Sequence, residues 1–359
     1  MLLPDDRPVT ILGDGVDQTI LDYANNMDVD TDLIVIQGIN QTIERLSIVG
    51  PVEFNKLSGE GAGIRIKSDK VGSGVDTDIF GVHVRDVKIS FCAGYGVHVD
   101  GTRNNSSNPE NNFSVWGVYE RVDVDSPGKG CVAIDSPSPA TKTEASTTQY
   151  FKDCFFQGFN DSAVLATTAN GLAFERCVFQ AGLAGTPGNG GAIHLTETNQ
   201  VVIVGCWFED IPGTVIKATS NSGNYIGIAV RSCLFSSAGS SQTTYVEFAG
   251  TGKSIEVANL TIFESAKPSS GHHVVIGSSC EATVSGGGVV GGLGASQELD
   301  VGDQSSKSVL LGSMWRIRLP RLSASDVSAF SNWAAGDTIF NTSTGKAQIY
   351  DGSAWQSLW

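Results

Sequence analysis

The chain has 359 residues, of which 43 are glycine, and it carries a formal net charge of −15 from 23 basic and 38 acidic side chains. Neutralising phosphates requires clustered Lys and Arg, so this acidic balance argues against binding to nucleic acid or to an anionic membrane surface. Glycine makes up about 12 % of the residues, against roughly 7 % in average proteins, which disfavours a long helical bundle and indicates a β protein with many turns.

The first seven residues, Met-Leu-Leu-Pro-Asp-Asp-Arg, contain neither the basic nor the long apolar region of a signal peptide, so none is expected there. No apolar run approaches the roughly 20 residues that a membrane-spanning helix needs, and membrane insertion is not expected. The seven cysteines are odd in number and form no Cys-x-x-Cys pair, which argues against a disulfide framework and against a cysteine-based zinc site.

A short alternating strand motif recurs along the chain. Four copies hold a cysteine at the same place, and these cysteines are 23, 29 and 27 residues apart: Cys154, Cys177, Cys206 and Cys233. Similar motifs without cysteine precede and follow them. Fixed strands separated by connectors of varying length are typical of a solenoid, whose insertions fall in loops.

A second short strand follows each motif after a polar turn, as at residues 163–166 and 192–195. We therefore predict an all-β fold, a right-handed parallel β-helix of about ten coils in which equivalent residues stack about 4.8 Å apart. The first inward ladder would be Leu46, Val87, Val122, Cys154, Cys177, Cys206, Cys233 and Leu260. The second would be Ile48, Ile89, Val124, Phe156, Phe179, Phe208, Phe235 and Ile262. A β-sandwich is the competing fold, but the repeat at coil-length intervals argues against it.

The first coil is expected at residues 8–15 and 18–22. Its Ile-x-Gly-x-Gly pattern followed by Thr-Ile resembles the opening coil of the pectate-lyase-like β-helix superfamily, and the resemblance covers about residues 7–318. It is a resemblance of repeat architecture, so it implies the right-handed β-helix and no particular activity. We assign residues 1–318 to the β-helix.

The chain changes character at its end, where four of the six tryptophans lie: Trp315, Trp333, Trp355 and Trp359. Residues 319–335 are predicted to form a linker and residues 336–359 a small β-hairpin module with a Thr-Ser-Thr-Gly turn. The module resembles one found near the C-termini of bacteriophage tail fibres and tailspikes, through Gly336, Asp337, Asn341, Thr342, Thr344, Tyr350, Asp351, Gly352 and Trp355. Exposed aromatics need a partner, which is a trimer interface, the last coil or a stacked sugar.

A β-helix followed by such a module resembles a tailspike or another trimeric virion surface protein. The resemblance implies a homotrimer that contacts other virion proteins, recognises a host surface glycan and is assembled in the host cytoplasm into the virion, with an extracellular location as the alternative. No cofactor is expected. Two functions remain open: a non-catalytic virion protein that binds polysaccharide or decorates the particle, and a depolymerase (lyase or glycoside hydrolase) on the same fold.

Outward positions beside the first ladder alternate in charge: Arg45, Asp86, Arg121, Asp153 and Arg176. At strand spacing this alternation predicts a cross-strand ladder of ion pairs. The alternative is that an arginine acts as the base or as a carboxylate clamp in a polysaccharide lyase. On that interpretation, Arg121 and Arg176 are candidate carbohydrate-binding residues.

The next outward positions gather carboxylates, amides and one indole. The catalytic candidates are Asp123, Asp125 and Glu209, and the other carbohydrate-binding candidates are Trp207, Gln157 and Gln180. Asp125 and Glu209 would lie three coils apart, about 14 Å. That exceeds the roughly 6.5–9.5 Å between the carboxylates of inverting glycosidases; Asp123 lies closer to Asp125, or to Asp153, than Asp125 does to Glu209. In the alternative interpretation a loop or a neighbouring subunit covers an apolar stripe of Phe155, Val178, Trp207 and Leu234.

Asp100 and Asp135 form a second candidate catalytic pair, because they follow equivalent strands on adjacent coils, about 5 Å apart as retaining glycosidases require. Both residues are also ordinary turn formers. His98 and His194 would lie three coils apart, so no metal site is predicted. The long polar connectors at residues 100–113 and 136–148 are the expected places for loop-borne binding.

Overall fold

The computed structural model describes most of the residues of the chain. They are residues 1–3, 7–23, 28–50, 59–67, 79–100, 114–135, 147–182, 191–220, 224–237, 242–264, 272–291, 296–297, 299–303, 309–311, 317–318, 321–329 and 338–357.

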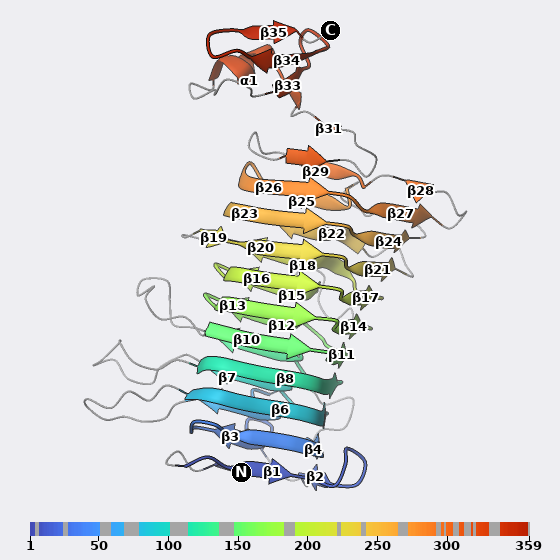
Figure 1. The fold of residues 1–359 in the computed structure, drawn as a ribbon. Coiled ribbons are helices and arrows are strands. Elements are labelled where there is room, and N and C mark those ends of the chain that lie inside the picture. The colour runs from blue at the N-terminus through green and yellow to red at the C-terminus, as the bar shows by residue number, and fades with distance from the viewer. Residues whose placement is uncertain are drawn as a thin grey trace, which may run out of the picture.

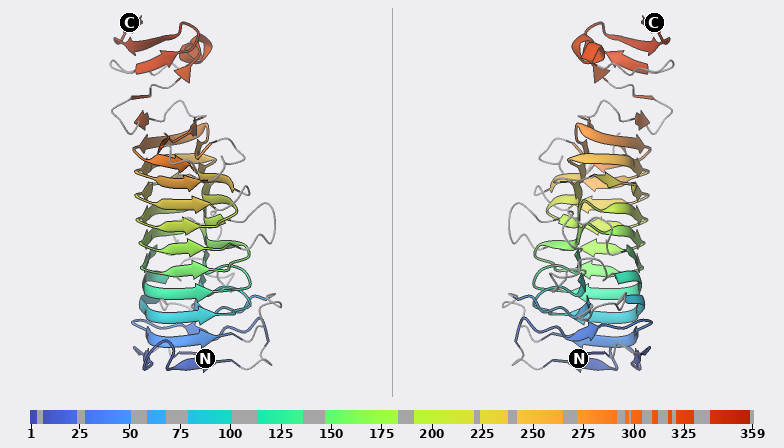
Figure 2. Two further views of the ribbon diagram at one scale, coloured as in Figure 1. Left: turned by 90° about the vertical axis from the view of Figure 1, so that its right-hand side faces the viewer. Right: turned by 90° about the vertical axis from the view of Figure 1, so that its left-hand side faces the viewer.

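Two long sheets wrap around one core to form a parallel β-helix, as predicted (Figures 1 and 2). The smaller sheet has ten strands that follow each other in chain order, one from each pass of the chain. They are β3 (Ile34–Ile36), β5 (Ile64–Lys67), β7 (Val97–Asp100), β9 (Val132–Asp135), β12 (Ser162–Thr167), β15 (Gly191–Thr196), β18 (Gly213–Thr219), β22 (Gln242–Phe248), β25 (Val274–Ile276) and β29 (Val301–Asp303).

The larger sheet has 21 strands and is bent along its length into two arms. Three long strands run through both arms: β4 (Thr42–Val49), β6 (Ile79–Ser90) and β8 (Ser114–Asp125). The first arm also holds β1 (Thr10–Leu12), β10 (Thr147–Lys152), β13 (Asn170–Glu175), β16 (Asn199–Val204), β19 (Tyr225–Ile226), β20 (Ile228–Arg231), β23 (Thr251–Ala258), β26 (Ser279–Ser285) and β30 (Val309–Leu311). The second arm also holds β2 (Ile20–Asp22), β11 (Phe155–Gln157), β14 (Val178–Gln180), β17 (Trp207–Glu209), β21 (Leu234–Ser237), β24 (Thr261–Glu264) and β27 (Gly288–Gly291).

One residue per coil makes the bend between the arms, and each has a positive φ. We call these residues the bend row: Arg45, Asp86, Arg121, Asp153, Arg176, Gly205, Ser232, Asn259 and Gly286. A single left-handed residue turns the strand direction without a loop, and Gly, Asn and Asp adopt this conformation at the lowest cost. The three arginines do not share that preference, so their place in the row has to be explained by what their side chains contact.

The core matches both predicted ladders, because every one of their sixteen side chains is at most 1 % exposed. All seven cysteines are buried and free, as expected for small apolar core residues. In the second ladder the rings stack from coil to coil, with centroids 4.8 Å apart for Phe179 and Phe208 and 4.9 Å for Phe208 and Phe235. A further buried stack of Tyr119, Phe151 and Phe174 fills the first arm, and the sequence reasoning did not identify it.

Ten passes of the chain build the β-helix, but its two ends are irregular, so the regular coils are slightly fewer than the predicted ten. The first coil is built from three strands of only three residues each, β1 to β3. At the other end, β28 (Ser296–Gln297) and β31 (Ile317–Arg318) pair antiparallel to β27 and β30 and interrupt the regular pattern.

A separate sheet of four strands follows the β-helix and includes the predicted hairpin (Figure 1). Its elements are β32 (Arg321–Leu322), β33 (Thr338–Asn341), β34 (Lys346–Tyr350) and β35 (Trp355–Ser357), with α1 (Ala324–Ala329) beside them. Although β32 lies in the stretch predicted as a linker, it pairs with β33. The Asn341 Oδ1 atom accepts hydrogen bonds from the Ser343 and Thr344 amides and thereby shapes the hairpin turn. Within the described residues, α1 has six residues and is too short to span a membrane.

Trp355 packs against Tyr350 across the hairpin, with ring centroids 5.4 Å apart. Two residues of the predicted tail motif, Gly336 and Asp337, lie outside the described residues, as do Trp315, Trp333 and Trp359 of the tail. The same holds for residues 101–113 and 136–146, which are most of the two predicted binding connectors.

Candidate functional site

The outward face of the second arm brings six of the predicted site residues onto one surface. Four of them are in direct register on successive strands and form what we call the acid-amide row: Asp125, Gln157, Gln180 and Glu209. A neighbouring row on the same face holds Asp123, Phe155, Val178, Trp207 and Leu234. The sequence pattern was sufficient to predict both rows, because alternation within each strand fixes which side chains point outward.

The acid-amide row is a line of hydrogen-bonding groups, one per coil. Gln180 donates from Nε2 to Glu209 Oε2 over 3.3 Å, and Asp125 Oδ1 accepts a 2.8 Å hydrogen bond from the Ser126 hydroxyl. Asp125 and Glu209 are three rungs apart, which is about 14 Å at strand spacing. They therefore do not form a catalytic pair, but they do mark the two ends of an extended polar line.

Trp207 supplies an apolar surface next to this line. Its side chain is 45 % exposed, between Val178 and Leu234 on the adjacent strands. Glu209 is two residues further along the same strand and points to the same side. An exposed indole beside a carboxylate and an amide can contact both the apolar face and the hydroxyl groups of a sugar.

Asp123 is the most unusual carboxylate on this face. Burial raises its pKa, the nearby Lys88 lowers it, and the Asp125 charge raises it further. Its Oδ1 atom is buried and has no hydrogen-bond partner within the part of the chain that the structure describes. Asp123 and Asp125 lie two residues apart on one strand face, about 6.7 Å along the strand. This backbone spacing places the two carboxylates on one face, where both can reach one ligand, as the paired carboxylates of a glycosidase do.

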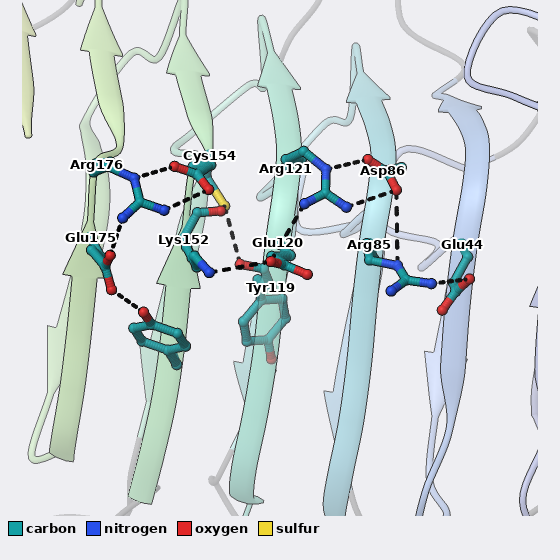
Figure 3. Close-up of polar contacts among 12 residues, drawn as sticks. Glu44, Arg85, Asp86, Tyr119, Glu120, Arg121, Lys152, Cys154, Glu175 and Arg176 are labelled. Carbon is teal, nitrogen blue, oxygen red and sulfur yellow. Dashed lines mark hydrogen bonds and ion pairs between the residues drawn. The ribbon is translucent and has the colours of Figure 1, made fainter.

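Arg121 and Arg176 lie on the bend row rather than on the second arm, and each forms a two-bond pair with an aspartate of the preceding coil (Figure 3). Arg121 binds Asp86 over 2.5 and 3.0 Å, and Arg176 binds Asp153 over 2.8 and 2.9 Å. These hydrogen bonds hold the pKa values of Asp86 and Asp153 below the usual range. The predicted ion ladder is confirmed for these two pairs, and it explains why the bend row includes arginines.

A second charged row runs directly beside the bend row, and the sequence reasoning missed it. Its members alternate in sign from coil to coil: Glu44, Arg85, Glu120, Lys152 and Glu175. Arg85 contacts Glu44 at 2.9 Å and Lys152 contacts Glu120 at 3.5 Å, while Arg176 joins the two rows through Glu175 (Figure 3). The signal was available, since each of these residues immediately precedes a member of the bend row.

The candidate pair Asp100 and Asp135 lies on the smaller sheet, in direct register on β7 and β9. Asp100 pairs with Arg65 at 2.8 Å, and Asp135 contacts His98 Nε2 at 2.7 Å. These basic partners are typical of a structural ion cluster. His98 and His194 are three rungs apart, and no group of three metal-ligating side chains occurs within the described ranges.

No protein-family model matches the chain, and no curated protein matches it in sequence. Among solved structures, PfbA, a surface adhesin of Streptococcus pneumoniae, is similar with a TM-score of 0.51 and 8 % identity, over 97 % of this chain and 87 % of the adhesin. Tailspike protein 3 of bacteriophage CBA120 matches with a TM-score of 0.47 and 11 % identity, over 99 % of this chain and 61 % of the tailspike. The pre-mature gene product 12 of bacteriophage phi29 gives a TM-score of 0.35 and 10 % identity, over 90 % and 54 %. The similarity to the adhesin supports the β-helix fold.

Proposed function

We propose that the protein is a tailspike-like virion surface protein that binds a host surface polysaccharide along the second arm. The observation that supports this best is the acid-amide row beside the exposed Trp207. A polysaccharide is itself a repeating chain, so hydrogen-bonding groups repeated every 4.8 Å or so suit it better than a compact ligand. The virion location rests on the tail module's resemblance, and an extracellular location is the alternative.

A microarray of bacterial capsular polysaccharides and lipopolysaccharides tests this proposal. The intact protein should bind at least one of them, and Trp207→Ala should weaken that binding about tenfold or more, since a buried aromatic contact of roughly 1.4 kcal/mol corresponds to a factor of ten. The matched control is Leu12→Ala, which removes a side chain 61 % exposed on the first coil. No binding to any polysaccharide, or equal loss in both variants, would refute the proposal.

Hydrolysis of the bound polysaccharide is the second candidate function, and it rests on Asp123. A carboxylic acid whose pKa is raised by burial can act as the general acid, and the neighbouring Asp125 can activate water. Both Asp123→Asn and Asp125→Asn should then abolish release of reducing ends, whereas Asp153→Asn on the bend row should retain it. Retention of activity in either of the first two variants would exclude this mechanism.

A homotrimer is the proposed assembly. Rotation about an axis parallel to the β-helix keeps each coil at its own height, so equal coils of neighbouring copies meet. Val202 on the first arm is exposed and can lie in a contact between copies, which leaves Trp207 on the second arm open to a ligand. Light scattering should give three times the mass of one chain, and Val202→Asp should reduce it. A monomeric mass for the intact protein would contradict a trimer.

A further inference from the structure

A second row of left-handed residues crosses the first arm near the start of its strands. This start row holds Asn40, Gly81, Trp116, Thr148, Gly171, Gln200, Gly227 and Ser254, all with positive φ. They occupy equivalent places on successive strands. Seven of the eight are glycine or residues with short or polar side chains, and Trp116 is the exception.

Trp116 has a φ of 63°. A left-handed backbone is unfavourable for any side chain with a Cβ atom and is a genuine outlier for a bulky one. The side chain is not a core residue that the fold holds in this conformation, because the indole is 47 % exposed. Strained residues of this kind are concentrated at functional sites, where the surrounding structure holds them in place. The position therefore calls for an explanation based on what the exposed ring contacts.

The surroundings of Trp116 form a small aromatic platform. The His83 ring meets the indole edge-on, with centroids 5.5 Å apart and planes at 80°, and Phe80 is exposed on the same neighbouring strand. On the other side, Thr148 lies opposite Trp116 on β10 and is also exposed. The platform thus combines two exposed rings with an imidazole and a hydroxyl that can form hydrogen bonds.

We propose that Phe80, His83 and Trp116 bind a sugar ring, as a second carbohydrate site on the first arm. The inference rests on the proposed function for its class of ligand, a polysaccharide. The small size of the platform favours a sugar over a protein. Phe80 and Trp116 each have a surface of about 150–250 Å² and are less than half exposed, so together they offer about 200 Å² to a ligand. A stable protein interface needs about 800 Å² from each partner.

The substitution Trp116→Gly separates binding from folding. Glycine adopts the left-handed backbone without the steric cost that it has for tryptophan. The variant should therefore melt at the same temperature as the intact protein or higher. It should nevertheless bind the polysaccharide selected on the microarray at least tenfold more weakly, measured by biolayer interferometry. Leu12→Ala should match the intact protein in both measurements. A lower melting temperature for Trp116→Gly would show that the ring is structural and would overturn the proposal.

Unchanged polysaccharide binding by Trp116→Gly would also overturn it, and a fall in oligomer mass in that variant would assign the platform to a protein contact instead. Comparison with Trp207→Ala separates the two carbohydrate proposals. Loss of binding in Trp116→Gly alone would support the site on the first arm and refute polysaccharide binding on the second arm. Loss in Trp207→Ala alone would do the reverse, and no polysaccharide binding by the intact protein would refute both.

Discussion

The stacked phenylalanines of the second ladder give the sharpest test of how the β-helix is held together. Phe179 is fully buried, between Phe156 at 5.1 Å and Phe208 at 4.8 Å. Replacing a buried Phe with Ala costs about 3–5 kcal/mol, because it loses the burial of the ring and leaves a cavity. Each lost ring pair contributes about 0.5–1.5 kcal/mol beyond the buried area, and the cost of about 3–5 kcal/mol already includes part of this contribution. We expect Phe179→Ala to lower the free energy of unfolding by about 4 kcal/mol.

Urea denaturation followed by circular dichroism measures this loss. The control is Phe263→Ala on the outside of the same arm, where the side chain is 41 % exposed and the expected loss is below about 1 kcal/mol. Phe179→Leu retains most of the side-chain volume and should fall between them. A loss below about 1 kcal/mol for Phe179→Ala, or a loss equal to that of Phe263→Ala, would refute a continuous ring stack as the core of the β-helix.

Three further predictions concern charge and burial. Burial raises the pKa of Asp123 in the folded protein, so its charged form destabilises the fold. Asp123→Asn should therefore melt at a higher temperature than the intact protein at neutral pH. The difference should vanish below about pH 3.9, the pKa of Asp in an unfolded chain, because the carboxyl is then protonated in both states. Arg176 lowers the pKa of Asp153, so their pair stabilises the fold above the unfolded pKa and is lost as pH falls through the folded one. Because the pair is exposed, Arg176→Ala should destabilise the fold only slightly at pH 7, and this loss should shrink as the pH falls below about 3.9, by urea titration. Burial raises the pKa of the Cys92 thiol to about 12, and all seven cysteines are buried, so the folded protein should react with a thiol reagent only after denaturant is added.

The ladders were predictable from the sequence because each strand repeats the same alternation, whatever the length of its connectors. Cys154 and Phe156 belong to two stacks for the same reason that Cys177 and Phe179 do, and one register fixes all of them. The outward rows followed from this register, which is why Asp125, Gln180 and Glu209 fall in line as predicted.

The backbone conformation of single residues and the partners of the ion pairs could not be predicted from the sequence. Trp116 looks like an ordinary strand residue in the sequence, and only its φ distinguishes it. Arg65 and Asp100 are 35 residues apart, and His98 and Asp135 are 37 apart, so their contacts depend on connectors of unequal length. The sequence predicted the faces on which these side chains lie, but not which charged partner each would find.

The second arm as a polysaccharide-binding surface is the central claim, and a crystal structure with a bound oligosaccharide tests it most directly. The oligosaccharide should come from the polysaccharide that the intact protein binds on the microarray. We predict sugar units along the line from Asp125 to Glu209, with one ring lying over Trp207. Sugar density only on other surfaces, with Trp207 covered by another copy of the chain, would contradict the claim.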